Sequence, residues 1–156
     1  MTLIAYLKID DIPGEATSEG HEEEIDIHGL NWAVDAPAAS GRRRAAQPKV
    51  RPLKLHKYTD KASPYLTLAC LRRQSFPEMT LTVRANTGDA IVDYLVFKLE
   101  NCTILRHVME NGDEDDARIH ELLSIGFETI TETYDTGRSG DAGEEHEIQY
   151  NIVSRA

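Results

Sequence analysis

Apolar and polar residues alternate with a period of two along much of this chain, and this alternation limits what it can fold into. The alternation is clearest in residues 79–85, where four apolar residues are interleaved with Thr80, Thr82 and Arg84. A period of two sends successive side chains to opposite faces of a β-strand. The pattern therefore predicts a strand with one face in the core and one in water, in a chain that folds mainly as β-sheet.

Eight segments with strand character are separated by turn signals. They cover residues 2–9, 24–34, 50–58, 79–85, 91–100, 103–109, 122–134 and 148–152. An irregularity is expected at Asn101-Cys102, between the fifth and sixth segments. This number of strands predicts a β-barrel of two packed sheets. With 156 residues, the chain is long enough for a real core, and we expect a single domain over residues 1–156.

One stretch breaks the alternation and predicts a helix over about residues 63–74. The Ser63 hydroxyl can cap the first turn, and Pro64 suits the first helical position because its missing N–H has no partner to lose there. Pro77 bars continuation of the helix. Apolar residues expected on its packing side are Tyr65, Leu66, Leu68, Ala69 and Cys70. We therefore expect one helix packed against the side of the barrel.

Charge is unevenly distributed along the chain. The net charge is −10, which argues against general nucleic-acid binding because that function needs a basic surface. Residues 1–78 hold 11 acids and 11 bases, whereas residues 79–156 hold 16 acids and 6 bases. The basic residues that follow Asp35 can thus face an acidic half of the same chain or of a neighbouring copy.

A long exposed loop is predicted at about residues 35–48. It has no hydrophobic periodicity and contains Gly41 and two prolines. Loops of this length in a compact domain are usually functional or disordered. The basic residues in and beside it are Arg42, Arg43, Arg44, Lys49 and Arg51. A self-interaction with the acidic half is the function that this loop favours.

The sequence offers little for chemistry. The acids and histidines of residues 21–28 alternate with Ile25 and Ile27, which favours a solvated strand face over a metal site. The turn that starts at Asn111 lacks the glycine and the final glutamate of a calcium loop, where Asp116 and Leu122 stand instead. No nucleophile elbow or phosphate loop occurs, so we expect no catalytic residue, no metal and no cofactor.

The compartment is also constrained. Cys70 and Cys102 give no disulfide framework, and buried free thiols are the expected state. No run of residues reaches the length of a membrane span, and the N-terminus lacks the features of a secretory signal. We therefore expect a chain made soluble in the cytoplasm, without membrane insertion, whose export would need another route.

Several motifs together resemble the haemolysin-coregulated protein family, Hcp, the tube subunit of the type VI secretion system. The resemblance extends from Leu7-Lys8-Ile9 to Tyr150-Asn151-Ile152. Its motifs are Pro13-Gly14-Glu15, the IDIHGLNW sequence of residues 25–32, the KYTDKASP sequence of residues 57–64, Ala69-Cys70 and the aromatic-rich final strands. The most specific of them is Asp60-Lys61-Ala62-Ser63-Pro64.

The resemblance implies a β-barrel with one flanking helix that assembles as a hexameric ring. Rings of this family stack into a tube inside a contractile sheath, below a spike protein with valine-glycine repeats. Members are secreted, and small effector proteins can be carried in the lumen of the ring. From the length we expect no additional toxin domain of the kind that some members carry, and residues 42–44 fall in a region that varies in the family.

On this basis two site hypotheses follow. The basic loop would contact an acidic patch on the next subunit or ring. The candidate receivers are Asp113, Glu114, Asp115, Asp116, Asp141, Glu144 and Glu145. Asn31, polar between Leu30 and Trp32, would face the lumen and contact cargo.

Two alternatives stay open from the sequence. A phage-type tail tube protein would share nearly all of these physical properties, and only neighbouring genes or the sheath partner would separate the two. A monomeric small β-barrel, acting as an enzyme or as a binding module, is the other alternative. Ring-sized particles in solution would exclude it.

Overall fold

The computed structural model of the protein describes residues 3–38, 47–88, 90–137 and 143–153. In these residues there are eleven strands and one helix. The strands are β1 (Ile4–Lys8), β2 (Ile25–Ile27), β3 (Gly29–Asn31), β4 (Val34–Asp35), β5 (Lys49–Val50), β6 (Leu53–Tyr58), β7 (Ser75–Asn86), β8 (Ile91–Asn111), β9 (Ile119–Gly126), β10 (Thr129–Asp135) and β11 (Glu145–Asn151); the helix is α1 (Ser63–Leu71).

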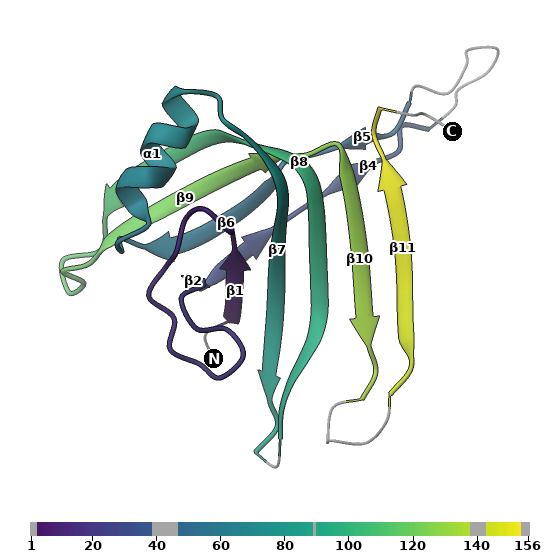
Figure 1. The fold of residues 1–156 in the computed structure, drawn as a ribbon, viewed down its shortest axis with the longest axis horizontal. Coiled ribbons are helices and arrows are strands. Elements are labelled where there is room, and N and C mark those ends of the chain that lie inside the picture. The colour runs from purple at the N-terminus through teal and green to yellow at the C-terminus, as the bar shows by residue number, and fades with distance from the viewer. Residues whose placement is uncertain (1–2, 39–46, 89, 138–142, 154–156) are drawn as a thin grey trace.

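Nine strands form one curled sheet, in the order β2-β1-β7-β8-β9-β6-β3, with β10 and β11 added beside β8 (Figure 1). All its pairs are antiparallel. The two ends of this path, β2 and β3, are separated only by His28, whose N–H donates to the His56 carbonyl of β6 at 2.9 Å. Because β2 and β3 are adjacent in sequence, the two ends of the sheet lie next to each other and the sheet is curled. The expected mainly β, barrel-like class with one flanking helix is confirmed.

Strand β8 belongs to both halves of this curled sheet. Its 21 residues pair with β10 up to Glu100 and with β9 from Thr103 onward. Between these halves Asn101 has a φ of +53°, a left-handed conformation that asparagine tolerates better than most residues. Pro77 of β7 lies at the same level, between the paired rows Phe76–Cys102 and Glu78–Glu100. The irregularity predicted at Asn101-Cys102 is confirmed.

The strand segments expected from the sequence differ mainly at their ends. The two segments of residues 91–109 form one strand, β8, whereas residues 122–134 divide into β9 and β10 around Phe127 and Glu128. Residues 24–34 divide into β2, β3 and β4. Residues 24–34 and 122–134 each change pairing partner where they divide, whereas β8 changes partner from β10 to β9 while it stays paired with β7 on its other side.

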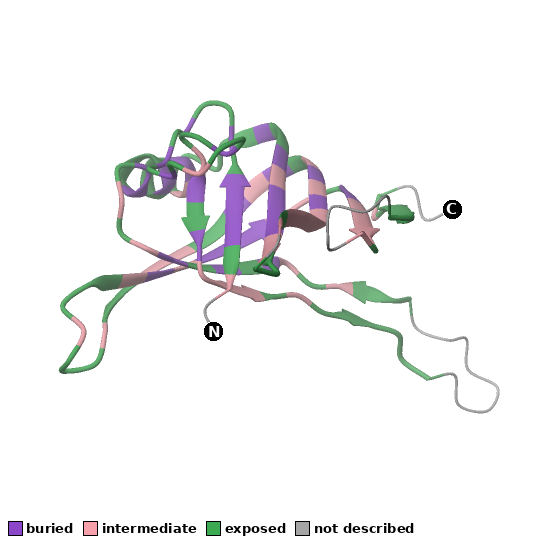
Figure 2. Cartoon of the chain, turned by 90° about the horizontal axis from the view of Figure 1, so that it is seen from below, coloured by how far each residue is buried: buried purple, intermediate pink, exposed green. Residues whose placement is uncertain are grey.

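The core lies inside the curl, and Figure 2 shows its buried residues concentrated in the body of the molecule. Leu53 and Leu55 of β6, Leu81 of β7, Leu99 of β8 and Leu123 of β9 are fully buried. The alternating pattern of these strands is what places them there, because their neighbours in sequence point to the other face.

The helix is shorter than expected and is capped differently. Ala62, not Ser63, is the N-cap residue, and it makes no side-chain cap; instead its own N–H donates to Asp60 Oδ1 at 3.0 Å. Pro64 occupies the first turn, as predicted. The helix ends at Leu71 because Arg73 adopts a φ of +51°, which no helical residue has. Ser63 is the first helical residue, and its hydroxyl is used in the interior.

Strands β4 and β5 form a separate two-stranded sheet, with Val34 opposite Val50 and Asp35 opposite Lys49. We refer to residues 33–38 and 47–51 as the arm. Figure 2 shows the arm leaving the body of the molecule. The loop predicted at about residues 35–48 is the connection between its two strands. Residues 36–38, 47 and 48 are exposed, and residues 39–46 lie outside the described residues.

Candidate assembly surfaces

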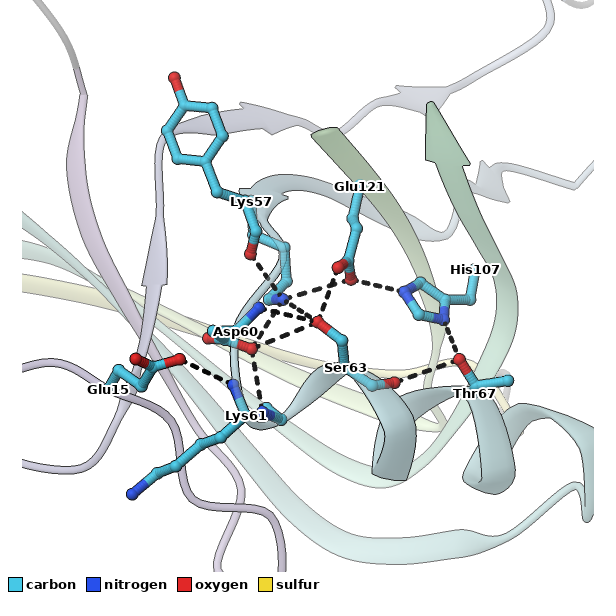
Figure 3. Close-up of polar contacts among 10 residues, drawn as sticks. Glu15, Lys57, Asp60, Lys61, Ser63, Thr67, His107 and Glu121 are labelled. Carbon is cyan, nitrogen blue, oxygen red and sulfur yellow. Dashed lines mark hydrogen bonds and ion pairs between the residues drawn. The ribbon is translucent and has the colours of Figure 1, made fainter. Parts of the chain in front are cut away.

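A buried polar network connects α1 to the sheet (Figure 3). At its centre the Lys57 ammonium, fully buried, lies within hydrogen-bond distance of four oxygens, to which its three N–H groups donate: the Tyr58 carbonyl at 2.9 Å, Asp60 Oδ1 at 2.9 Å, Ser63 Oγ at 3.1 Å and Glu121 Oε1 at 3.2 Å. A buried charge must be paired and hydrogen-bonded to be tolerated. Lys57 meets that condition through residues of β6, β9 and the start of α1.

The carboxylate of Glu121 is the matching anion. It accepts from the Ser63 hydroxyl at 2.6 Å and from His107 Nε2 at 2.6 Å. Burial raises the pKa of Glu121, but these hydrogen bonds and the charge of Lys57 outweigh burial and lower the pKa to about 2. His107 also contacts the Thr67 hydroxyl at 3.0 Å. The network therefore fixes the position of α1 against β6, β8 and β9.

The outer side of α1 is apolar and exposed. Tyr65, Leu68 and Leu71 are 58%, 41% and 77% exposed, and they recur every three residues, so they lie along one side of the helix. We call these three residues the helix stripe. The inner side is made by Ser63, Leu66 and Ala69. The expectation that Tyr65 and Leu68 pack on the body is wrong, because the buried network brings Ser63, and hence the opposite side of the helix, to the sheet.

A second apolar surface lies where the arm meets the sheet. It is a groove of about 310 Å³. Its lining residues are Trp32, Val34, Pro48, Val50, Ile130, Glu132, Ile148 and Tyr150. We call it the apolar groove. Trp32 makes an edge-to-face contact with the core residue Phe97, with ring centroids 5.6 Å apart, and its Nε1–H donates to the Arg51 carbonyl at 3.0 Å. The indole thus joins the arm to the body.

Strand β11 borders this groove and is the end strand of the sheet. It pairs with β10, and all seven of its residues are exposed. Ile148 and Tyr150, which line the groove, are 57% and 39% exposed. An exposed end strand with apolar side chains is a surface on which another chain can add, and proteins that stay monomeric protect such strands.

The predicted basic residues lie in or beside the arm. Arg42, Arg43 and Arg44 lie outside the described residues. Lys49 is exposed in β5, opposite Asp35. Arg51 Nε donates to Asp35 Oδ2 at 2.8 Å, and both side chains are about half exposed. Arg51 therefore already has an anionic partner within its own arm.

The predicted acidic receivers fall into two groups. Asp113, Glu114 and Asp115 are exposed in the turn between β8 and β9, whereas Asp116 accepts from Arg118 and His120. The hydrogen bonds from Arg118 hold the pKa of Asp116 far below its usual range. The second group, Glu144 and Glu145, is exposed at the start of β11, and Asp141 lies outside the described residues.

Figures 1 and 2 place the turn between β8 and β9 and the arm at opposite ends of the molecule. Lys49 and Asp113 therefore belong to surfaces that do not meet within one chain. A contact between them can only form between copies. Asn31 is exposed in β3, opposite Lys54 of β6, on a different part of the sheet from β10 and β11.

Two of the acids and histidines of residues 21–28, His21 and Glu24, make hydrogen bonds within the fold. The His21 side chain has Glu24 Oε1 at 2.9 Å from Nδ1 and Asp93 Oδ2 at 2.8 Å from Nε2, and Asp93 also accepts from Arg84 Nε at 2.7 Å. We call these four residues the His21 cluster. In the described part of the chain, no group of three or more His, Cys, Asp or Glu side chains has an arrangement that could hold a metal ion.

Two features of these surfaces escaped the sequence analysis. The network around Lys57 lies in the KYTDKASP motif, but its anion, Glu121, is 64 residues away and no local pattern connects them. The helix stripe could have been found, because Tyr65, Leu68 and Leu71 recur every three residues, as Leu66 and Ala69 do, but are offset from them by one residue around the helix. The described residues contain no helix long and apolar enough to cross a membrane.

The chain is thus a curled antiparallel sheet with one short helix held by buried charges, and it exposes apolar surfaces at two ends. The sequence profile of the family described as type VI secretion system effector, Hcp, matches residues 6–134. This chain belongs to the Hcp family of the type VI secretion system.

Relatives are similar over nearly the whole chain. Protein hcp1 of Pseudomonas aeruginosa is 27% identical over 155 residues, which are 96% of this chain and 94% of that protein. A type VI secretion system effector of Yersinia pestis has a crystal structure that is similar with a TM-score of 0.75 at 25% identity, covering 95% of this chain and 99% of that one. Hcp1 of Salmonella typhimurium shares the fold, with a TM-score of 0.79 at 22% identity over 99% and 97% of the two chains.

Proposed function

We propose that this chain is the structural tube subunit of a type VI secretion system. It assembles as hexameric rings, and the rings stack into a tube inside a contractile sheath, below the spike protein. The chain is made in the cytoplasm and is secreted by the apparatus itself, with small effectors carried in the ring lumen. Its family membership supports this function over a phage-type tail tube protein.

The observation that carries the proposal is the exposed apolar surface around β11 and the arm. Val34 and Ile148 are more than half exposed, although both are apolar and both line the apolar groove. Apolar groups that remain in water after folding are characteristic of surfaces that a partner covers. A monomeric enzyme or binding module gains nothing from such an arm, whereas a ring subunit uses it to contact its neighbours.

The test is the size and shape of the particle in solution. Light scattering after size exclusion should give six times the chain mass, and negative-stain microscopy should show rings. An Ile148→Glu variant places a charge in the groove and should shift the protein toward the monomer. Ile91→Glu, the same change at a residue that is 62% exposed at the β7–β8 turn, is the control. A monomer at every concentration would contradict the proposal.

Ring stacking is a separate element of the proposal. The basic residues Arg42–Arg44 and Lys49 would contact the acidic turn at Asp113–Asp115 of the next ring. The opposite charges of these basic residues and of the acidic turn support this pairing. An Arg42/Arg43/Arg44→Glu variant should form rings but not stacks, and a partner variant with Asp113/Glu114/Asp115→Lys should restore mixed stacks. Stacking of the wild type should weaken with salt, because exposed charges are screened.

Cargo binding is the third element. Asn31 is exposed, and it is the residue that we propose to face the lumen. An Asn31→Arg variant should keep the ring but lose retention of a small effector in a pull-down experiment. If the variant retained as much effector as the wild type, Asn31 would not belong to the cargo surface, which would lie on another part of the sheet.

A further inference from the structure

We propose that the helix stripe of one copy inserts into the apolar groove of the next copy in the ring. The exposed end of α1, with Arg72 and Arg73, would then lie beside Glu132 of the neighbour. This inference rests on the proposed function and goes beyond it, because it assigns the two surfaces that meet between adjacent subunits.

The first step is that the helix stripe is exposed and held in place. Leu71 is 77% exposed, more than any other large apolar residue among those described. The opposite side of the same helix is fixed by Ser63, which hydrogen-bonds to Lys57 and to Glu121. A surface that is already ordered loses little conformational entropy on binding, so a rigid stripe is suited to recognition.

The second step is that the walls of the apolar groove are exposed among the described residues. Its lining residues Val34, Ile148 and Tyr150 are 58%, 57% and 39% exposed. Glu132 is the one charged residue in its lining. A groove with apolar walls and a single carboxylate fits an apolar side chain that is flanked by a cation.

The third step is chemical complementarity. Leu71 is followed directly by Arg72 and Arg73, and all three are exposed. The end of α1 therefore offers an apolar group for the groove and a guanidinium for Glu132. An arginine that pairs with a carboxylate at the border of an apolar contact fixes the relative orientation of the two partners and also increases their affinity.

The fourth step is the position of the two surfaces. Figure 1 shows α1 at one end of the long axis and β4, β5 and β11 at the other, and Figure 2 shows the same separation. Two different surfaces that bind each other make a head-to-tail contact, which generates a ring when the rotation closes. Surfaces at opposite ends of one chain are what such a ring requires, and this identifies a second copy as the occupant of the groove.

The size of the contact agrees with this assignment. A stable interface buries about 800 Å² on each partner, with an apolar centre and a polar rim. Three helix residues cover less than that area. The stripe and the groove would thus form the centre of the contact, and the exposed residues of β11 and the arm would form its rim.

Disulfide trapping tests the contact directly. In a Cys70→Ala background, the double variant Leu71→Cys/Ile148→Cys should give a ladder of covalent oligomers on non-reducing gels, ending at the closed ring. Each single variant should remain without a ladder. The matched control is Ile91→Cys/Ile148→Cys, because Ile91 is 62% exposed but lies at the β7–β8 turn. The remaining Cys102 is fully buried, and burial raises the pKa of its thiol to about 12, so it does not react.

A charge exchange gives an independent result. Glu132→Arg should raise the concentration needed for ring formation by about tenfold or more, as expected for a residue at the centre of an interface. Adding Arg72→Glu and Arg73→Glu to the same chain should restore most of the loss. Thermal melting of each variant at low concentration shows that the monomer is folded.

The outcomes separate the inference from the proposed function. Rings without a ladder, or with an equal ladder in the Ile91 control, would overturn the stripe-to-groove contact and leave the tube function in place. Loss of rings in Glu132→Arg without any recovery in the charge exchange would also count against it. A wild type that forms no ring would overturn both.

Discussion

The two ends of this molecule are stabilised in opposite ways. At the α1 end, Lys57 and Glu121 are buried and all their contacts are made within the chain. At the arm end, the β4–β5 ladder is two residues long, and the ion pair between Arg51 and Asp35 is about half exposed. Both ends keep apolar groups in water, but the α1 end is held by buried charges of its own chain, whereas the arm end is held by a short ladder and exposed charges.

This difference separates folding from assembly. Mutations in the buried network should act on the free energy of unfolding of the single chain. Mutations in the arm and β11 should leave that free energy nearly unchanged and act on the association of copies. All stability measurements must be made at one fixed, low protein concentration, because association itself adds to apparent stability.

The largest effect should come from breaking the buried ion pair. Glu121→Gln removes the anion next to Lys57 and should lower the free energy of unfolding by about 3–5 kcal/mol, the cost of leaving a buried charge without its partner. Urea denaturation measures it. Ile148→Ala at the other end should cost less than about 1 kcal/mol. Equal losses in both variants would remove the distinction between the two ends.

Acid should lower the free energy of unfolding through the same α1 end of the molecule. The pKa of Glu121 is about 2 in the folded chain against an ordinary 4.5. A lowered pKa means that the ionised carboxylate contributes stability above pH 4.5, and that this contribution is lost as the pH falls toward 2. The loss should be about 3 kcal/mol and should be absent from Glu121→Gln. Denaturant titrations of the two proteins at pH 7, 4 and 2 provide the comparison.

The stability that the His21 cluster contributes should decrease as the pH rises, and by less than the loss expected from Glu121 in acid. Burial lowers the pKa of His21, but the hydrogen bonds to Asp93 and Glu24 outweigh burial and raise it above 6.5. A raised pKa means that the protonated imidazole stabilises the fold below pH 6.5 and that this contribution is lost as the pH rises through the folded pKa. A His21→Gln variant should lack this pH dependence, and NMR titration of the imidazole should report the folded pKa. A measured pKa of the His21 imidazole at or below 6.5 would contradict this prediction.

The smallest effect is expected in the arm. Asp35→Asn removes the ion pair with Arg51, whose two side chains are 51% and 55% exposed. Exposed pairs contribute less than about 1 kcal/mol, and salt screens them. Melting temperatures at low and high salt should be nearly the same as those of the wild type. A large decrease in melting temperature would show that this ion pair holds the arm in place within its own chain.

The fold was predictable where one face of a strand is buried. The alternation of residues 79–85 identified β7, and the signal at Asn101-Cys102 identified the irregularity in β8. The division of residues 122–134 was missed, because a change of pairing partner leaves no mark on local hydrophobicity. Residues 148–150 were correctly predicted to belong to the last strand. Their exposure could not be predicted, because it depends on β11 being an end strand of the sheet, which local sequence does not show.

The candidate site was less accessible to sequence reasoning. Lys57 and Glu121 meet across 64 residues, and alternation places Lys57 on the core face without naming its partner. Arg51 and Asp116 were assigned to contacts between copies, and the structure shows that each has partners of its own. The roles of Asp113, Glu114, Glu144 and Asn31 stay predictions until rings and stacks of the variants are examined.

The meeting of β2 and β3 at His28 also bears on how fast the chain folds. Residues 25–31 pair with β1 on one side of this point and with β6 on the other, so they cannot find both partners until the strands between are in order. The pairings of β1 with β7 and of β6 with β9 join residues 62 to 80 positions apart in sequence, and pairings so distant are slow to form. We expect this segment to join last, so that Ile27→Val speeds unfolding and leaves the folding rate unchanged.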